Sequence, residues 1–289
     1  MNLPPLCLGL LGHPVSHSRS PAMMRAALDA AGIDGLYAAF DVAPADLPVA
    51  LDGLWALGFR GVNVTAPHKA AVRSLLGHAV TPEAEATGAV NTLGRGASGW
   101  IGHNTDVEGL VLALGDAGAE LRGQSVVVLG AGGAARAAVT SLRALGAVRV
   151  TVVARQAAGA SAVARVAAAQ GLSAASAALG SPEAREALAG AAGVLQCTSA
   201  EVAGAGRLEV DLGLCPLGAL AVDLVYCPRV TPWMARATAA GLRVVPDAGA
   251  AMLAGQGAAA FAWWTDRDPP LGVMRGALDA ALDVACGRS

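Results

Sequence analysis

Short apolar runs alternate with Ala-rich stretches along the chain, and the clearest example lies near its middle. Residues 125–129 form a β-branched apolar run, followed directly by a glycine-rich turn and by an Ala- and Leu-rich stretch that ends at Gly146. A second apolar run occupies residues 149–154. Continuous apolar runs of this length are typical of buried parallel strands. Strand, turn, helix and strand within about 30 residues predict a βαβ unit.

Further apolar runs at residues 193–197, 219–226 and 242–245 predict more strands of the same sheet. The Ala-rich residues 156–206 favour helices rather than disorder, because Ala is the strongest helix former. We therefore expect a Rossmann-like, doubly wound dinucleotide-binding domain over residues 106–249.

The two ends of the chain carry a second alternation of elements. The pattern predicts strands at 7–11, 36–42 and 61–65 and helices at 21–31, 45–57, 250–264 and 272–285. Ser20 is expected to cap the first of these helices, with Pro21 at its first position. Altogether the pattern predicts an α/β fold with two domains, which a length of 289 residues suits.

Composition excludes several function classes. The formal net charge is −2 and the sequence has no basic stripe, which argues against nucleic-acid binding. No uninterrupted apolar run reaches the roughly 18 residues of a membrane span. Residues 1–11 carry no Lys or Arg and do not match a signal peptide, so we expect a cytoplasmic protein.

The glycine-rich turn matches the pattern G-x-G-x-x-A at Gly130, Gly132 and Ala135. Its position between a strand and a helix is the context that a dinucleotide-binding turn requires. Gly130 permits the tight turn, Gly132 lets the backbone approach a pyrophosphate, and the helix N-terminus attracts the anion. The alternative is a glycine-rich turn that binds nothing, which this context disfavours.

The second strand of the βαβ unit ends in Ala154-Arg155-Gln156, with no acidic residue. In NAD-binding domains an acidic residue near this point pairs with the ribose 2′-hydroxyl. Arg155 would instead bind a 2′-phosphate, which favours NADP over NAD. The alternative is a solvated arginine at a strand end.

The first polar cluster of the N-terminal third surrounds a predicted helix start. Ser18 and Ser20 lie there, where hydroxyls suit a carboxylate ligand, although helix capping alone is the commoner explanation. His13 and His17 have the spacing of helical metal ligands, but Pro14 disfavours a helix at this point. The five cysteines are never spaced C-x-x-C. We therefore expect no metal site.

Two further segments concentrate asparagine and threonine. Asn63 and Thr65 alternate onto one face at the end of a predicted strand, and Lys69 follows closely. Asn91 and residues 104–106 form the third segment. Such side chains suit hydrogen bonds to a polyhydroxylated ligand, or equally a set of Asx turns.

Lysine is almost absent from the chain. Of the 20 basic residues, 19 are arginine and one, Lys69, is lysine. A drift toward GC-rich codons explains the shortage, and chance is the simplest reason for the survivor. The alternative is that position 69 needs a group that can give up a proton, which an arginine guanidinium does not do.

Six motifs, in order along nearly the whole chain, resemble the motif set of the shikimate dehydrogenase family. They are Gly12-x-Pro14-x-x-His17-Ser18-x-Ser20-Pro21, Asn63-Val64-Thr65-x-Pro67-His68-Lys69, Gly88-Ala89-Val90-Asn91-Thr92, Asn104-Thr105-Asp106, Gly130-Ala131-Gly132-Gly133-Ala134 and Met252-Leu253-x-Gly255-Gln256.

This resemblance implies an NADP-dependent oxidoreductase that interconverts 3-dehydroshikimate and shikimate, in the chorismate pathway to aromatic amino acids. Residues 1–105 with 250–289 would form the α/β substrate-binding catalytic domain, and residues 106–249 the dinucleotide-binding domain. The enzyme would act on this small-molecule substrate as a monomer or homodimer, without nucleic acid or membrane.

The resemblance also implies the roles of individual residues. Lys69 and Asp106 would form the catalytic pair, in which either Lys69 alone or the pair transfers the proton. Ser18 and Ser20 would hold the substrate carboxylate, near Tyr226. The remaining substrate-binding residues would be Asn63, Thr65, Asn91 and Gln256, and the cofactor-binding residues Gly130, Ala131, Gly132, Gly133, Ala134, Arg155 and Met252.

Several positions depart from the family pattern. Ala154 and Gln156 replace the Asn and Thr beside the family's arginine, which weakens the indication of NADP, and Val107, Cys227 and Ala251 also differ. Two alternatives therefore stay open. One is a quinate or aminoshikimate dehydrogenase relative that uses NAD or both cofactors. The other is a non-catalytic, nucleotide-sensing regulatory protein, against which the intact catalytic pair and glycine turn argue.

Overall fold

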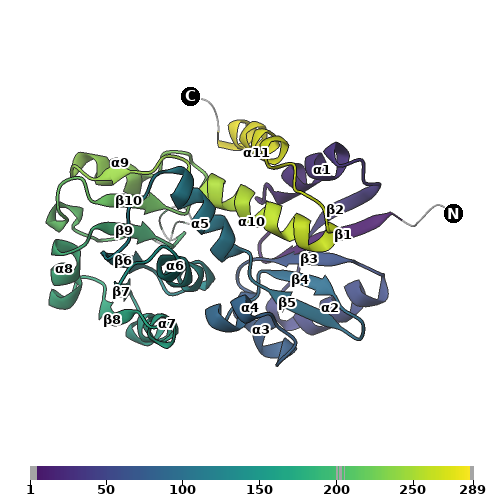
Figure 1. Cartoon of the computed structure of the whole chain (residues 1–289), viewed down its shortest axis with the longest axis horizontal. Helices are drawn as coiled ribbons and strands as arrows, with labels where there is room; N and C mark the ends of the chain where they lie inside the picture. Colours follow the sequence, from purple (N-terminus) through teal and green to yellow (C-terminus); the bar gives the residue numbers. More distant parts are fainter. Residues whose placement is uncertain (1–4, 200, 202–203, 205, 287–289) are drawn as a thin grey trace. The chain divides into compact units, whose positions relative to one another are not determined.

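The computed structural model describes residues 5–199, 201, 204 and 206–286. The chain divides into two compact units (Figure 1). Unit 1 is Met1–Gly109 with Leu253–Ser289, and unit 2 is Leu110–Met252. Helices α5 (Asp106–Asp116) and α10 (Ala248–Thr265) carry the chain from one unit into the other.

Unit 1 is built on a five-stranded sheet with the strand order β2-β1-β3-β4-β5. The first three strands are parallel, and β4 and β5 continue the sheet in antiparallel fashion. The strands are β1 (Leu6–Gly12), β2 (Gly35–Asp41), β3 (Gly61–Val64), β4 (Thr92–Arg95) and β5 (Trp100–His103). The helices that belong wholly to this unit are α1 (Ser20–Ala30), the short 3-10 helix η1 (Pro44–Asp46), α2 (Leu47–Ala56), α3 (Lys69–Leu76), α4 (Pro82–Thr87) and α11 (Leu271–Cys286).

Close packing in unit 1 joins segments that are far apart in sequence. Helix α1 turns Met23, Met24 and Leu28 into the core and packs along α11. The indole of Trp264, in α10, lies over Gly61 and donates a hydrogen bond from Nε1 to the Leu93 carbonyl at 2.9 Å. A Cβ on Gly61 would lie only 2.2 Å from that nitrogen, so the glycine makes room for the ring.

Unit 2 carries a six-stranded, all-parallel sheet with the order β11-β10-β9-β6-β7-β8. This is the doubly wound arrangement in which the strand order reverses between β6 and β9. The strands are β6 (Ser125–Leu129), β7 (Arg149–Ala154), β8 (Ser173–Ala178), β9 (Gly193–Gln196), β10 (Leu220–Asp223) and β11 (Arg243–Val244). The helices are α6 (Gly133–Ala144), α7 (Ala157–Ala169), α8 (Pro182–Ala189), α9 (Pro232–Ala239) and the short η2 (Leu212–Leu214).

Both faces of this sheet are covered, which explains the continuous apolar run of β6. Val126 and Val128 pack in one core cluster with α6 and α7. Val127 and Leu129 pack in another with α8 and α9. Because alternate residues of a strand point to opposite faces, a strand between two helical layers is apolar throughout.

The predicted α/β class with a doubly wound parallel sheet is confirmed, and the structure corrects several details. The Ala-rich residues 156–206 contain strand β8 as well as helices. The strand predicted at 219–226 is limited to Leu220–Asp223. Ser20 is the first residue of α1 and not its cap, since Arg19 holds the N-cap position without a side-chain hydrogen bond.

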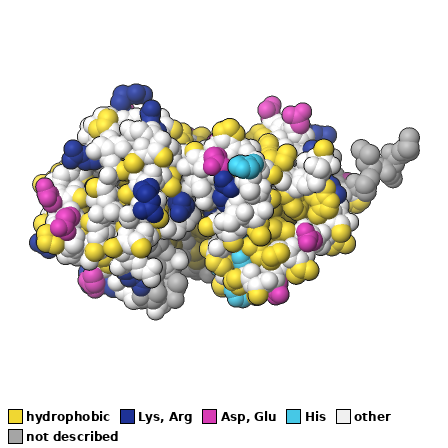
Figure 2. All heavy atoms as spheres, turned by 90° about the horizontal axis from the view of Figure 1, so that it is seen from below, with side chains coloured by type: hydrophobic (Ala, Val, Ile, Leu, Met, Phe, Trp, Pro, Cys, Tyr) yellow, Lys and Arg dark blue, Asp and Glu magenta, His cyan; other side chains and the backbone are white. Residues whose placement is uncertain are grey.

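Among the residues that the structure describes, no helix is long and apolar enough to cross a membrane. On the face drawn in Figure 2, basic and acidic side chains are interspersed with apolar and neutral surface.

Candidate active site

An ion pair between Lys69 and Asp106 lies at the centre of the candidate site. Lys69 is the first residue of α3 and Asp106 the first residue of α5. Lys69 Nζ donates a hydrogen bond of 2.6 Å to Asp106 Oδ2. The aspartate side chain is 6% exposed and the lysine side chain 19%, so the pair is largely screened from water but the amine remains accessible.

The other carboxylate oxygen of Asp106 is also engaged. Asn91 Nδ2 donates to Asp106 Oδ1 at 2.8 Å, and the backbone N–H of Asp106 donates to Asn104 Oδ1 at 3.1 Å. Each carboxylate oxygen can accept a further hydrogen bond. Asp106 is thus fixed in orientation and can still accept from a ligand hydroxyl.

Strand register explains why these residues meet. Thr92 pairs with Asn63 on one side and with His103 on the other. Asn91, just before β4, therefore lies beside the segment that follows β5, and its backbone N–H donates to the His103 carbonyl. Its Oδ1 accepts from the Thr105 backbone at 2.8 Å and from Thr92 Oγ1 at 2.9 Å.

Asn63 extends this buried network toward β2. Its Nδ2 donates to Thr92 Oγ1 at 3.0 Å, and its Oδ1 accepts from the hydroxyl of Tyr37 at 2.8 Å. Tyr37 is 3% exposed, and burial raises the pKa of its phenol far above the ordinary value. Tyr37 was not predicted as a site residue; its only signal in the sequence is that the chain has just two tyrosines.

The serines and Thr65 lie around the start of α1 and the end of β3. Ser20 is buried, and its backbone N–H donates to Ser18 Oγ at 3.3 Å. Thr65 is half-buried, and its carbonyl accepts from the His68 backbone at 3.0 Å. Hydroxyls are thus present where a carboxylate ligand was predicted.

Gln256, in α10, adds a further amide to the site. The Thr105 hydroxyl donates to Gln256 Oε1 at 3.5 Å, and Gln256 Nε2 donates to the Leu253 carbonyl at 2.9 Å. One connected set of side chains in unit 1 therefore holds Asn63, Lys69, Asn91, Asp106 and Gln256. Ser18 and Ser20 lie together at the start of α1. Tyr226 belongs to unit 2, where it is half-buried after β10. Its role stays a prediction.

The histidines have other partners. His13 Nδ1 lies 2.6 Å from Asp41 Oδ1, with both side chains about half exposed. His103 is buried beside Thr81, 3.6 Å from Glu83 and 3.9 Å from Glu108. Burial lowers the pKa of His103, and the two carboxylates oppose this shift. In the described part of the chain, no group of three or more His, Cys, Asp or Glu residues could hold a metal ion.

The glycine turn of unit 2 fits a dinucleotide. Gly130 has φ +122°, and a Cβ there would lie 2.8 Å from the Thr198 methyl group, so only glycine fits. Gly132 is exposed, with nothing within 4 Å of where its Cβ would stand. Helix α6 starts at Gly133, and no described side chain caps it. Its first N–H groups are thus available to an anion.

The other predicted cofactor residues lie in the same unit. Arg155 follows β7 and is exposed, as a residue that contacts a phosphate must be in the free protein. Arg136 of α6 is half-buried, and burial together with the nearby charge of Arg165 lowers the pKa of its guanidinium. Met252 is 8% exposed and packs in the core cluster of α6 and α7.

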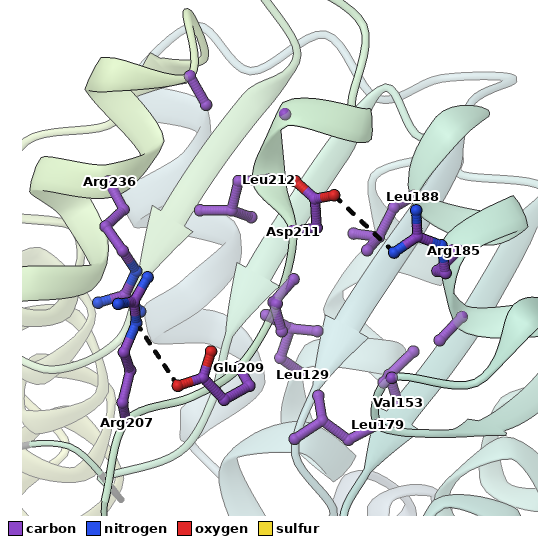
Figure 3. A pocket seen from close by; sticks show the side chains of 15 residues that line it. Leu129, Val153, Leu179, Arg185, Leu188, Arg207, Glu209, Asp211, Leu212 and Arg236 are labelled. Atoms are coloured by element: carbon purple, nitrogen blue, oxygen red, sulfur yellow. Dashed lines mark ion pairs between the residues drawn. The ribbon is translucent and has the colours of Figure 1, made fainter.

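A pocket of about 430 Å³ in unit 2 lies apart from all predicted site residues (Figure 3). Its walls come from the sheet face that α8 and α9 cover, opposite the face of α6. The charges at its rim face each other in pairs: Arg185 lies 3.9 Å from Asp211 and Arg207 3.8 Å from Glu209 (Figure 3). None of the predicted catalytic, substrate-binding or cofactor-binding residues lines it.

Comparisons with known proteins show which family the sequence resembles. Residues 10–93 match the family model of the shikimate dehydrogenase substrate binding domain, and residues 249–278 match that of the shikimate 5′-dehydrogenase C-terminal domain. The chain is 45% identical to the shikimate dehydrogenase (NADP(+)) of Citrifermentans bemidjiense, over 95% of this chain and 94% of the relative.

Solved structures agree as well. Shikimate 5-dehydrogenase from Thermus thermophilus, in complex with NADP(H) and shikimate, has a TM-score of 0.81 at 39% identity, covering 96% of this chain and 100% of that one. Quinate dehydrogenase from Corynebacterium glutamicum, in complex with NAD, has a TM-score of 0.83 at 31% identity, covering 96% and 99%.

Proposed function

Because this chain belongs to the shikimate dehydrogenase family, we propose that it catalyses the reversible, NADP-dependent reduction of 3-dehydroshikimate to shikimate. The observation that carries the proposal is the Lys69–Asp106 pair, with both carboxylate oxygens of Asp106 held by hydrogen bonds in a buried amide and hydroxyl network.

The chemistry requires a proton donor at the substrate ketone. When bound, NADPH supplies a hydride to the carbonyl carbon, and negative charge then develops on the carbonyl oxygen. The ammonium of Lys69 gives that oxygen a proton, and in the reverse direction the amine takes it back. Asp106 orients the amine through its 2.6 Å hydrogen bond and accepts from the neighbouring ring hydroxyl.

Unit 1 offers the groups that bind the rest of the substrate. The hydroxyls of Ser18 and Ser20, at the start of α1, receive the carboxylate, where the helix N-terminus adds a favourable dipole. The polar side chains of the network bind the ring hydroxyls; these are Asn63, Thr65, Asn91 and Gln256.

Unit 2 offers the groups that hold the cofactor. Gly130 to Ala134 cradle the pyrophosphate at the N-terminus of α6, and Arg155 pairs with the 2′-phosphate. Met252 contacts the nicotinamide end. A cytoplasmic location and a monomeric or homodimeric state stay predictions.

The test is a turnover assay with purified protein. Shikimate or quinate is mixed with NADP⁺ or NAD⁺, and nicotinamide reduction is followed by absorbance. We expect the highest kcat/KM for shikimate with NADP⁺. Preference for quinate with NAD⁺ would support the quinate dehydrogenase alternative, and no turnover with any pair would overturn the enzymatic function.

A further inference from the structure

The hydroxyl of Tyr37 is bonded to Asn63, a residue that the proposed function assigns to the ring hydroxyls of the substrate. Tyr37 lies on β2, Asn63 on β3, and β1 runs between them. Leu8 of β1 pairs with Tyr37, and Leu10, on the same face, pairs with Asn63. The phenol therefore reaches diagonally across β1, a separation that aromatic side chains can span.

The direction of this hydrogen bond follows from counting protons. The phenol has one proton, and it donates this to Asn63 Oδ1 at 2.8 Å. Because burial raises the pKa of this phenol, it keeps its proton at any working pH.

The bond to Tyr37 also fixes how the Asn63 amide is turned. With Oδ1 facing the phenol, Nδ2 faces Thr92 Oγ1 at 3.0 Å and the Asn91 carbonyl at 3.3 Å. From Thr92 the network continues through Asn91 to Asp106. An unbroken series of hydrogen bonds thus leads from Tyr37 to the ion pair.

We propose that Tyr37 is a positioning residue for substrate binding, which holds the Asn63 amide in the orientation that the substrate needs. Tyr37 acts through Asn63 and not on the reacting atoms. Without its hydroxyl, Asn63 Oδ1 loses its buried donor and the amide is free to turn. This inference rests on the proposed function and adds a residue to its site.

The test is the variant Tyr37→Phe, which keeps the ring and removes only the hydroxyl. Losing one neutral hydrogen bond corresponds to about a fivefold to tenfold weaker interaction. We expect KM for shikimate to rise by about that factor, with kcat within about twofold and KM for NADP⁺ unchanged. Thr87→Val, which removes a buried hydroxyl of unit 1 that bonds to the backbone carbonyls of Glu83, Ala84 and Ala89, is the matched control and should leave both constants unchanged.

A double-mutant cycle separates positioning from general destabilisation. Because Tyr37 acts through Asn63, the KM of Tyr37→Phe combined with Asn63→Ala should rise by less than the product of the two single effects. If Tyr37→Phe does not fold, Asn63→Ala, which removes the acceptor of the Tyr37 hydrogen bond, is measured in its place. The inference about Tyr37 would be overturned, and the proposed function left standing, by any of three results. These are an unchanged or lower KM in Tyr37→Phe, a loss in kcat as large as the rise in KM, and multiplicative effects in the cycle. A wild-type chain that does not turn over shikimate would overturn the proposed function, and this inference with it.

Discussion

Replacing Lys69 by arginine tests the proposed proton transfer most directly. The substitution keeps a positive charge beside Asp106, so the ion pair can persist, but a guanidinium does not release a proton at any working pH. A positioned proton donor typically contributes about 10²–10⁴ in rate. We therefore expect kcat to fall by about that factor, which corresponds to about 3–5 kcal/mol in the activation barrier.

The structure also predicts that Lys69→Arg folds. Removing one partner of a buried ion pair typically costs about 3–5 kcal/mol, because the other charge is left uncompensated. Lys69→Met leaves the charge of Asp106 uncompensated. The Asp106 side chain is 6% exposed and would keep only uncharged partners such as Asn91. Lys69→Arg retains the charge, so its free energy of unfolding should fall by much less than that of Lys69→Met.

Two measurements are made on the same preparations. Steady-state kinetics with saturating shikimate and NADP⁺ gives kcat, and urea unfolding gives the free energy of unfolding. Arg73→Lys is the control, because Arg73 lies on the same helix and pairs with Glu85 outside the site. It should leave kcat unchanged. A Lys69→Arg variant that keeps kcat within about fivefold of the wild type would show that the amine is not the proton donor.

Three further predictions concern the cofactor, the core and pH. Arg155→Ala should raise KM for NADP⁺ by about tenfold or more and leave KM for NAD⁺ nearly unchanged, because the charge-assisted hydrogen bond to the 2′-phosphate is lost. Equal effects on the two KM values would exclude a 2′-phosphate contact. Gly61→Ala should lower the free energy of unfolding by about 1–3 kcal/mol, since its Cβ would collide with Trp264. Gly53→Ala, in α2, has open space around its Cβ and should raise the free energy of unfolding by about 0.5–1 kcal/mol. Similar urea midpoints of the two variants would contradict this. Burial lowers the pKa of His103 in the folded chain below its value of about 6.5 in the unfolded chain. Neutral His103 therefore contributes to the free energy of unfolding above about pH 6.5, and this contribution is lost as the pH falls through the pKa of the folded chain. His103→Gln should therefore lose less stability than the wild type between about pH 7.5 and about pH 5.5, and parallel pH profiles would contradict this.

The strands that sequence patterns predicted well are those buried on both faces. β6 and β7 coincide with the apolar runs at 125–129 and 149–154, because a parallel strand between two helical layers is apolar throughout. β8 was missed, since its sequence of Ser and Ala is mostly exposed and has no β-branched residue. Its partner β7, and not its own composition, makes it a strand.

Site residues were predictable where a short motif places several of them together. Asn63 and Lys69 share one motif around the end of β3, and residues 104–106 form another. The role of Tyr37 depends on β2 and β3 lying on either side of β1, which the sequence of β2 alone does not show. The same holds for Thr92, which joins Asn63 to Asn91 only through strand register.

The discontinuous make-up of unit 1 has a consequence for how the protein is made. Its sheet comes from the start of the chain, but Trp264 and helix α11, which complete its core, come from the end. Domains fold as units while the chain is synthesised. Unit 2 is contiguous and can close as soon as it has left the ribosome. At about 5–20 residues per second, the part of the 289-residue chain that follows Gly109 takes roughly ten to forty seconds to make. During that time the strands that carry Tyr37 and Asn63 have an uncovered apolar face. Premature termination just after Met252 therefore leaves a chain with a complete unit 2 and an incomplete unit 1.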